Sequence, residues 1–333
     1  MRLILGSHVA VVVADPAIPE IRHRSEIVNP SYVTAAADGR TVYAVSEDIG
    51  GPGMVYAFAV SGERLDPLGE PRLSGGEQPC HAQVHPSGRF LLVANYGDGS
   101  VAVLPIRDGG ELGPPSCVIA HQGSGVDLPR QSGPHAHQAV TDPSGQWVLV
   151  CDLGIDQVIV YRLDETTGLL RQHSIARFDG GQGIRHLAFS PDGTQAYVTA
   201  ELSSELVECE WDAPAGVLTP LRSINTVAMD GKPVERNYPG AIVLSTDGSR
   251  AYVTNRGHNS IGVVDTALFE LIGTRDCEGD WPRDAALSQD GQTLYVANEN
   301  SGTLVWFDVS GRTPEHITDA VLEVPEVTSI LPL

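Results

Sequence analysis

The stretch that decides the fold covers residues 132–201 and reads SGPHAHQAVTDPSGQWVLVCDLGIDQVIVYRLDETTGLLRQHSIARFDGGQGIRHLAFSPDGTQAYVTAE. It contains two successive copies of one unit. Each copy has an apolar strand, a turn that ends in Pro-Ser-Gly or Pro-Asp-Gly, a return strand and a third strand. Runs of β-branched and aromatic residues between glycine turns are typical of antiparallel hairpins, in which the turn glycine can adopt a positive φ. The stretch therefore predicts two consecutive antiparallel units.

The same turn occurs six times along the chain, at intervals of 43 to 57 residues, and ends at Gly39, Gly88, Gly145, Gly193, Gly248 and Gly291. Each turn is followed by a β-rich run such as TVYAV or WVLVCD, and then by a third strand such as QVIVYRL. These intervals are typical of a four-stranded propeller blade. No long segment has helical periodicity. The predicted fold class is therefore all-β, a ring of four-stranded antiparallel blades.

The six copies occupy about residues 29–325 and leave short apolar pieces at both ends: LILGS and VAVVVAD within residues 3–15, and VTSILPL at 327–333. Neither piece is long enough for a blade. A ring lacks free sheet edges only when its ends are joined, so we expect the C-terminal strand to pair with the N-terminal strands and complete a seventh blade. Because each blade buries its faces against its neighbours, we expect residues 1–333 to form one domain.

The chain is strongly acidic, with 21 Lys and Arg residues, 42 Asp and Glu residues and a formal net charge of −21. This charge argues against nucleic acid and against an anionic membrane as partners. The five cysteines are scattered and form no CxxC motif, so no disulfide framework is expected. The N-terminal apolar run is too short for a signal peptide, and no run approaches the roughly 18 residues of a membrane helix. We therefore expect a cytoplasmic protein.

Polar residues recur at one phase of the repeat, eight residues before or after each turn glycine. The two strands of a hairpin begin and end at the same rim, so these positions converge on one face of the ring, near its axis. They are, in chain order, Ser31, Glu47, Cys80, Tyr96, His137, Leu153, Arg185, Glu201, Gly240, Arg256, Arg283 and Glu299. One rim is thereby predicted to collect a histidine, three arginines, three glutamates and a tyrosine.

Such a cluster suits chemistry on a carbonyl or a carboxylate. Glu201 or His137 could transfer protons, and the arginines could hold an anion or stabilise a developing negative charge. The alternative is structural, because Arg185 and Glu201 belong to one repeat and Arg256 could pair with a glutamate only to hold the ring together. His135 and His137 lack an evident third ligand, so neither a metal nor another cofactor is expected.

Four segments carry motifs in a recognisable order: 79–106 (PCHAQVHPSGRFLLVANYGDGSVAVLPI), 130–164 (RQSGPHAHQAV and onward), 183–206 (GIRHLAFSPDGTQAYVTAELSSEL) and 252–264 (YVTNRGHNSIGVV). Together they resemble the seven-bladed propeller lactonase family. That family includes bacterial 6-phosphogluconolactonases and fungal carboxy-cis,cis-muconate lactonising enzymes. The resemblance covers about residues 29–310, and its PHAH, RH and NRGH motifs are specific.

The resemblance implies four active-site residues, from PHAH, the RH segment, the end of the next strand and NRGH: His137, Arg185, Glu201 and Arg256. All four fall on the rim that the hairpin geometry selects. Arg283 in WPRDAAL resembles a further arginine of the family, and we expect it to hold a carboxylate or a phosphate. We also expect Tyr96, His135 and Glu299 to contact the substrate.

Three functions fit these observations, and the first is favoured. It is a lactonase that hydrolyses the ester of a sugar-acid lactone by general acid/base catalysis without a metal, with 6-phosphogluconolactone as the family's usual substrate. The second is the reverse, ring-closing reaction of a muconate-type cycloisomerase or a biosynthetic cyclase. The third is a non-catalytic binding propeller, although a scaffold has no need of four such residues on four hairpin ends. The expected partner is a small-molecule lactone or carboxylate.

The short N-terminal piece and the segment VERNYPGAIV at 234–243 depart from the family pattern, which affects the expected substrate more than the reaction.

Overall fold

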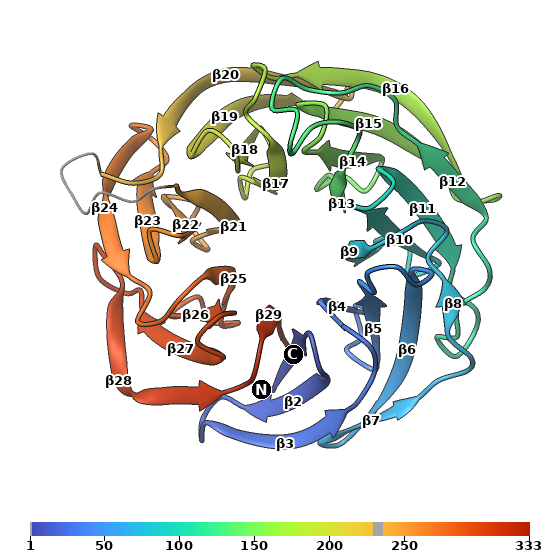
Figure 1. Cartoon of the computed structure of the whole chain (residues 1–333), viewed down its shortest axis with the longest axis horizontal. Coiled ribbons are helices and arrows are strands. Elements are labelled where there is room, and N and C mark those ends of the chain that lie inside the picture. Colours follow the sequence, from blue (N-terminus) through green and yellow to red (C-terminus); the bar gives the residue numbers. More distant parts are fainter. Residues whose placement is uncertain (1, 229–235) are drawn as a thin grey trace.

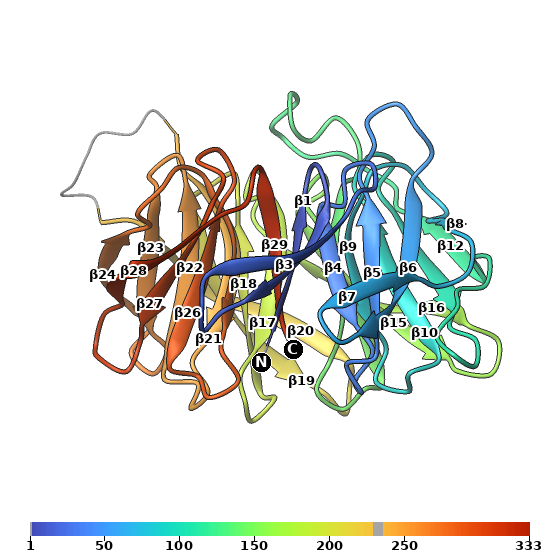
Figure 2. The ribbon, with the colours of Figure 1, turned by 90° about the horizontal axis from the view of Figure 1, so that it is seen from below.

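The computed structural model describes residues 2–228 and 236–333, which form a ring of seven antiparallel β-sheets (Figure 1). These residues contain strands and no helix, so the predicted all-β propeller is confirmed. Seven strands lie nearest the axis: β4 (Tyr32–Ala35), β9 (Pro79–Val84), β13 (Ala136–Thr141), β17 (Ile184–Phe189), β21 (Tyr238–Leu244), β25 (Pro282–Leu287) and β29 (Val327–Pro332). The strands run between the two faces of the disc, as the side view in Figure 2 shows.

The second strands of the blades are β5 (Thr41–Ser46), β10 (Phe90–Asn95), β14 (Trp147–Asp152), β18 (Gln195–Ala200), β22 (Arg250–Arg256), β26 (Thr293–Asn298) and β1 (Leu3–Ser7). The third strands are β6 (Met54–Ser61), β11 (Ser100–Pro105), β15 (Gln157–Asp164), β19 (Glu205–Asp212), β23 (Ser260–Asp265), β27 (Thr303–Asp308) and β2 (Val11–Asp15). The outer strands are β12 (Cys117–Ala120), β16 (Leu169–Arg177), β20 (Val217–Asn225), β24 (Glu270–Asp276), β28 (Glu315–Glu323), β3 (Glu20–Ser25), and the pair β7 (Arg64–Pro67) and β8 (Arg72–Leu73).

The predicted glycine turns join the first and second strands of six blades. Their six glycines have φ between 65° and 72°, a region that side chains with a Cβ rarely adopt. The second strands that follow are the most buried elements; all six residues of β10 and of β14 are buried. A strand covered on both faces reads as a continuous apolar run, which is why FLLVAN and WVLVCD lack alternation.

The ring is closed as predicted, by strands from the two ends of the chain. The order in the closing blade is β29, β1, β2, β3, and the pairing of β1 with β29 places Leu3 opposite Pro332 and Leu5 opposite Ile330. The N- and C-termini consequently lie close together (Figure 1). The N-terminal segment thus supplies three strands, because the polar run EIRHRS that follows the two short apolar pieces forms the outer strand β3.

The hydrophobic core lies between neighbouring blades. One cluster joins Leu92 and Val103 of the β9 blade to Val148 and Tyr161 of the β13 blade. Each blade therefore needs its neighbours to bury its apolar faces. All five cysteines are unpaired, as expected from their spacing. Among the described residues, no helix is long and apolar enough to cross a membrane.

Candidate active site at one mouth of the ring

Irregular pairing in the innermost strands determines where the rim side chains point. His137 in β13, Arg185 in β17 and Arg283 in β25 are each skipped in the pairing with the second strand. Cys80 and Thr328 are skipped in the same way. Such a β-bulge leaves one residue unpaired and redirects its side chain. The bulge therefore recurs at one position of the repeat and presents these residues toward the axis.

A narrow cavity lies among the bulged residues. It is lined from six inner strands by Ser31, Tyr32, Cys80, His137, Arg185, His186, Arg283, Asp284 and Thr328. The consecutive residues Arg185 and His186 both line it, although alternation in a regular strand would separate them. Only about 10 Å³ of its interior can be reached by the centre of a water molecule, which is room for about one water. A larger ligand therefore has to bind at the rim above the cavity.

A larger hollow of about 310 Å³ lies at the outer edge of the disc, between β16 and β20. It is lined by residues such as Arg177, Leu221 and Arg222, and by none of the predicted rim residues. The predicted site residues therefore lie at the rim and not in this larger hollow.

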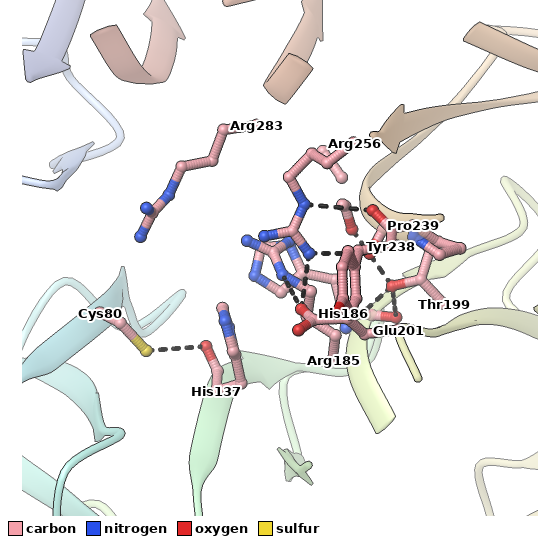
Figure 3. A network of polar contacts seen from close by, with 12 residues as sticks. Cys80, His137, Arg185, His186, Thr199, Glu201, Tyr238, Pro239, Arg256 and Arg283 are labelled. Carbon is pink, nitrogen blue, oxygen red and sulfur yellow. Dashed lines mark hydrogen bonds and ion pairs between the residues drawn. The ribbon is translucent and has the colours of Figure 1, made fainter. Parts of the chain in front are cut away.

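Glu201 is the centre of a cluster of three arginines, of which Figure 3 labels Arg185 and Arg256. Its Oε2 accepts a hydrogen bond from Arg256 Nη2 at 2.6 Å and lies 3.2 Å from Arg185 Nε. Its Oε1 accepts a hydrogen bond from Arg130 Nη2 at 2.7 Å. Guanidinium groups stay protonated in proteins, so three positive charges against one negative charge leave this cluster at +2 in a protein of net charge −21.

The arginines control the ionisation of Glu201. Burial by itself raises the pKa of a carboxyl group, but Arg256, Arg185 and Arg130 outweigh burial and hold the pKa of Glu201 well below its usual range. Glu201 is consequently a carboxylate with both oxygens engaged. Burial, and then Arg256, lower the pKa of Arg185 to about 9, so Arg185 remains protonated at neutral pH. Its buried Nη1 has no hydrogen-bond partner within the protein.

His137 lies beside this cluster as a neutral imidazole. It is 7% exposed, and its Nδ1 is buried without a hydrogen-bond partner. Its ring meets Tyr96 and His186 edge-on, with centroids 5.6 Å and 5.1 Å away. Burial, and then Arg185, lower the pKa of His137 well below 6.5. A proton-accepting nitrogen is therefore available at neutral pH, next to a positively charged group.

Arg283 forms a second cluster, in which carboxylates outnumber arginines. Its guanidinium lies 3.2 Å from Glu299 and 3.3 Å from Glu47. His8, in the loop between β1 and β2, places Nε2 2.9 Å from Glu299 Oε1, and this hydrogen bond raises the pKa of His8. Burial raises the pKa of Glu299, but the His8 hydrogen bond and Arg283 outweigh burial and lower it to about 2. Two carboxylates here share one arginine and one histidine.

The residues predicted to contact substrate also lie at this rim. Tyr96 and His135 stack with centroids 4.4 Å apart, and His135 Nδ1 lies 2.8 Å from the backbone oxygen of Tyr96. The Tyr96 hydroxyl accepts a hydrogen bond from Arg130 at 3.4 Å. Among the described residues, no group of three or more His, Cys, Asp or Glu side chains is arranged to hold a metal ion. The structure thus brings all eight predicted residues to one mouth of the ring, and their individual roles remain predictions.

Sequence reasoning missed several groups at this mouth. Arg130 lies in the loop between β12 and β13, outside the repeat phase, and only its position at the start of the RQSGPHAH segment hinted at it. His186 and Asp284 each follow a bulged residue, so strand alternation wrongly directs them away from the cavity. Asp284 Oδ2 accepts the backbone N–H of Ile330 at 2.8 Å and thereby ties β25 to β29. Burial raises the pKa of Asp284 to about 6.

The fold and the rim define a class: a closed seven-bladed propeller with an acid/base cluster at one mouth. The model of a family described as "Lactonase, 7-bladed beta-propeller" matches residues 8–332. The 6-phosphogluconolactonase of Bacillus subtilis is 34% identical over 89% of this chain and 85% of its own length. The 6-phosphogluconolactonase of Formosa agariphila is 28% identical over 84% of this chain and 81% of its own.

The fold is also similar to that of a solved structure. The periplasmic gluconolactonase of Pseudomonas aeruginosa has a TM-score of 0.89 and 31% identity, over 99% of this chain and 98% of its own. The protein therefore belongs to the seven-bladed β-propeller lactonase family and is an enzyme of that family. Because that similar structure is named as periplasmic, a cytoplasmic location for this chain stays a prediction.

Proposed function

We propose that the protein hydrolyses the cyclic ester of a sugar-acid lactone, with 6-phosphogluconolactone and gluconolactone as the first substrates to test. The observation that carries this proposal is that His137 and Arg185 line the same cavity. One has an unpartnered, neutral ring nitrogen, and the other has a buried, unpartnered N–H. Together they offer a nitrogen that can accept a proton and an N–H group that can donate a hydrogen bond to an oxyanion. The names of the relatives from Bacillus subtilis and Pseudomonas aeruginosa support the same substrate class.

His137 is the better candidate for the general base. The sequence leaves His137 and Glu201 as alternatives, but both oxygens of Glu201 accept contacts from arginines, whereas Nδ1 of His137 has no hydrogen-bond partner within the protein. A carboxylate held in this way has little tendency to take a proton from water. Glu201 instead orients Arg256 and Arg185, so that their remaining N–H groups can stabilise negative charge on the substrate.

In the proposed reaction, water attacks the carbonyl carbon of the lactone and gives a proton to His137. The carbonyl oxygen becomes an oxyanion, which Arg185 and Arg256 stabilise. When this tetrahedral intermediate collapses, the bond from the carbonyl carbon to the ring oxygen breaks, and His137 returns its proton to that oxygen. The product is the open-chain hydroxy acid, whose carboxyl group then releases its proton to the solvent. This sequence of steps requires neither a metal nor a covalent enzyme intermediate.

Hydrolysis is favoured over ring closure because the relatives compared above are named as lactonases. The ring-closing alternative would use the same proton transfers in reverse, and no contact in the described residues favours it. Incubation with muconates and measurement of the diene absorbance would detect it.

The test is the release of acid from each lactone, corrected for spontaneous hydrolysis. We expect His137→Asn to lower kcat by about 10²–10⁴-fold, as the loss of a general base does. We expect Arg185→Gln to lower it by about 10²–10³-fold, as the loss of an oxyanion donor does. Because burial keeps the pKa of His137 below 6.5, kcat/KM of the wild type should stay level as the pH falls through 6.5.

The matched control is His85→Asn. His85 is also a buried histidine, but it lies by the Gly88 turn at the opposite rim and contacts Ser87 Oγ and the backbone oxygen of Gly145. Its replacement should leave the rate unchanged. Wild-type rates in both His137→Asn and Arg185→Gln, or no hydrolysis of either lactone by the wild type, would contradict the proposal.

A further inference from the structure

Arg130 differs from the other arginines that hold Glu201. Arg185 and Arg256 project from strands and have side chains that are 3% and 9% exposed, whereas the side chain of Arg130 comes from a loop and is 32% exposed. That loop, green in Figure 2, projects from one face of the disc. A ligand that approaches the rim from solvent therefore meets Arg130 before the two buried arginines.

The loop that carries Arg130 is built as a fixed platform. The backbone N–H groups of Arg130 and Gln131 both donate to the backbone oxygen of Asp127, at 2.9 Å and 2.6 Å. The side chain of Gln131 is completely buried and donates to the backbone oxygen of Leu153 at 2.8 Å. A guanidinium on such a turn is positioned in advance and needs little ordering when a ligand binds.

An aromatic ring and a second arginine support this platform. The guanidinium of Arg130 lies 5.9 Å from the ring centroid of Tyr238, and that of Arg236 lies 5.3 Å from the same ring. Arg236 Nη2 in turn lies 3.2 Å from Asp127 Oδ2 in the Arg130 loop. The guanidinium groups of Arg130 and Arg236 thus both contact the ring of Tyr238, the first residue of β21.

The Glu201 side of the rim carries excess positive charge, which would attract an anion. Glu201 compensates only one of the three guanidinium groups that contact it, and Arg185 keeps a buried N–H without a partner. At the other side, Arg283 is matched by two carboxylates. A dianion at the rim would therefore be attracted to the Glu201 side. Phosphate monoesters carry about −1.5 to −2 charges at neutral pH and suit the planar fork of arginine.

We propose that Arg130 determines substrate specificity by binding an anionic group on the substrate, a phosphate monoester, at the outer edge of the rim. This proposal rests on the lactonase function proposed above and adds a residue that contacts the part of the substrate remote from the ester. Arg130 can leave Glu201 for the phosphate because Glu201 keeps its contacts with Arg256 and Arg185.

The experiment compares 6-phosphogluconolactone with gluconolactone for the wild type and Arg130→Gln. We expect KM for the phosphorylated lactone to rise at least about tenfold, the loss expected for a charge-assisted hydrogen bond. The value of kcat and the KM for gluconolactone should change by less than about threefold. An equal loss on both lactones, which a structural role would produce, or no loss on either, would overturn the proposal.

Two further variants complete the comparison. Arg130→Lys keeps the charge but loses the planar fork, so its KM for the phosphorylated lactone should lie between those of the wild type and Arg130→Gln. Arg40→Gln removes the same charge next to the turn glycine Gly39, at the opposite rim, and should leave both KM values unchanged. A KM shift in Arg40→Gln as large as in Arg130→Gln would show a general effect of net charge and would overturn the proposal.

A binding measurement tests Arg130 independently of catalysis. By calorimetry, the wild type should bind 6-phosphogluconate at least about tenfold more tightly than gluconate, and Arg130→Gln should lose that difference. If the wild type hydrolyses neither lactone, the proposed reaction fails while this measurement still decides the role of Arg130. Equal affinity of the wild type and Arg130→Gln for 6-phosphogluconate would overturn it.

Discussion

Two clusters of the same residue types lie at one mouth of the ring, and they differ in charge balance. In the first, Glu201 is shared by Arg130, Arg185 and Arg256. In the second, Arg283 is shared by Glu47 and Glu299. One cluster has two positive charges in excess, whereas the other has more carboxylates than arginines. Similar ion pairs therefore differ in charge: we propose that the first cluster holds its arginines ready for an anion, whereas in the second the carboxylates compensate Arg283 locally.

The histidines follow the same division. His137, beside the arginine-rich cluster, is kept neutral by burial and by Arg185. His8, beside the carboxylate-rich cluster, has a raised pKa because it hydrogen-bonds Glu299. An imidazole near surplus positive charge is thus kept neutral, whereas an imidazole near surplus negative charge tends to hold a proton. The proposed role of His137 as the general base therefore rests on this environment and not on residue type alone.

The largest effect should come from Glu201→Gln, which removes the carboxylate that the three arginines of the first cluster contact. Breaking a buried ion pair from one side leaves charges uncompensated, so we expect a loss of about 3–5 kcal/mol in the free energy of unfolding. Activity should fall by at least about 10²-fold because Arg185 and Arg256 lose their orientation. Added phosphate should stabilise the variant more than the wild type, as denaturant unfolding with and without phosphate would show.

Glu208→Gln is the control for that experiment. Glu208 has the same 4% exposure of its side chain and also pairs with an arginine, Arg222, but it lies on β19 in the blade wall. Arg222 is half-exposed, so water can solvate it after the change. We expect a smaller loss of stability and an unchanged lactonase rate. An equally inactive Glu208→Gln would show that the activity depends on general stability rather than on the rim.

A smaller effect is expected from Glu299→Gln in the second cluster. Arg283 keeps Glu47 as a partner, so the free energy of unfolding should fall by about 1–3 kcal/mol, the range for hydrogen bonds to charged groups. The catalytic rate should change by less than about tenfold, because no oxyanion donor is lost. A loss of activity as large as in Glu201→Gln would remove the distinction between the two clusters.

The stability that Glu299→Gln loses should depend on pH, in a direction that the pKa shifts of His8 and Glu299 determine. The raised pKa of His8 means that its contribution to stability is complete below 6.5 and disappears as the pH rises through the raised value. The lowered pKa of Glu299, about 2, means that its contribution is complete above 4.5 and disappears as the pH falls toward 2. The cost of Glu299→Gln should therefore be larger at about pH 5.5 than at pH 8.5. The same cost at both values would contradict the pairing of His8 with Glu299.

The smallest perturbation is a titration of the unmodified protein. By NMR of the imidazole signals, His8 should titrate above 6.5, whereas His137 should stay neutral to well below 6.5. His8→Gln and His137→Asn assign the two signals. The reverse order of titration would break the comparison between the clusters and would remove His137 as the general base at neutral pH.

Much of the fold could be predicted because it is periodic. Six turn glycines with positive φ set the repeat, and the apolar pieces at the two ends predicted the closing blade that β29 and β1 form. The rim residues His137, Arg185, Glu201 and Arg256 could also be predicted, because a hairpin brings positions equally spaced about its turn to the same end. The outer strand β3 could not, because EIRHRS carries too few apolar residues to show that it is a strand.

The sequence by itself therefore determined the ring and the set of side chains at one of its mouths, because both depend on local, repeated geometry. Only the tertiary structure decided which charges meet. The bulges that aim Arg185 and His186 into one cavity depend on pairing between strands, and the contact of Arg130 with Glu201 joins residues 71 positions apart in the sequence. Such contacts have no period along the chain, so the charge excess at Glu201 and the neutral state of His137 become apparent only when the ring is closed.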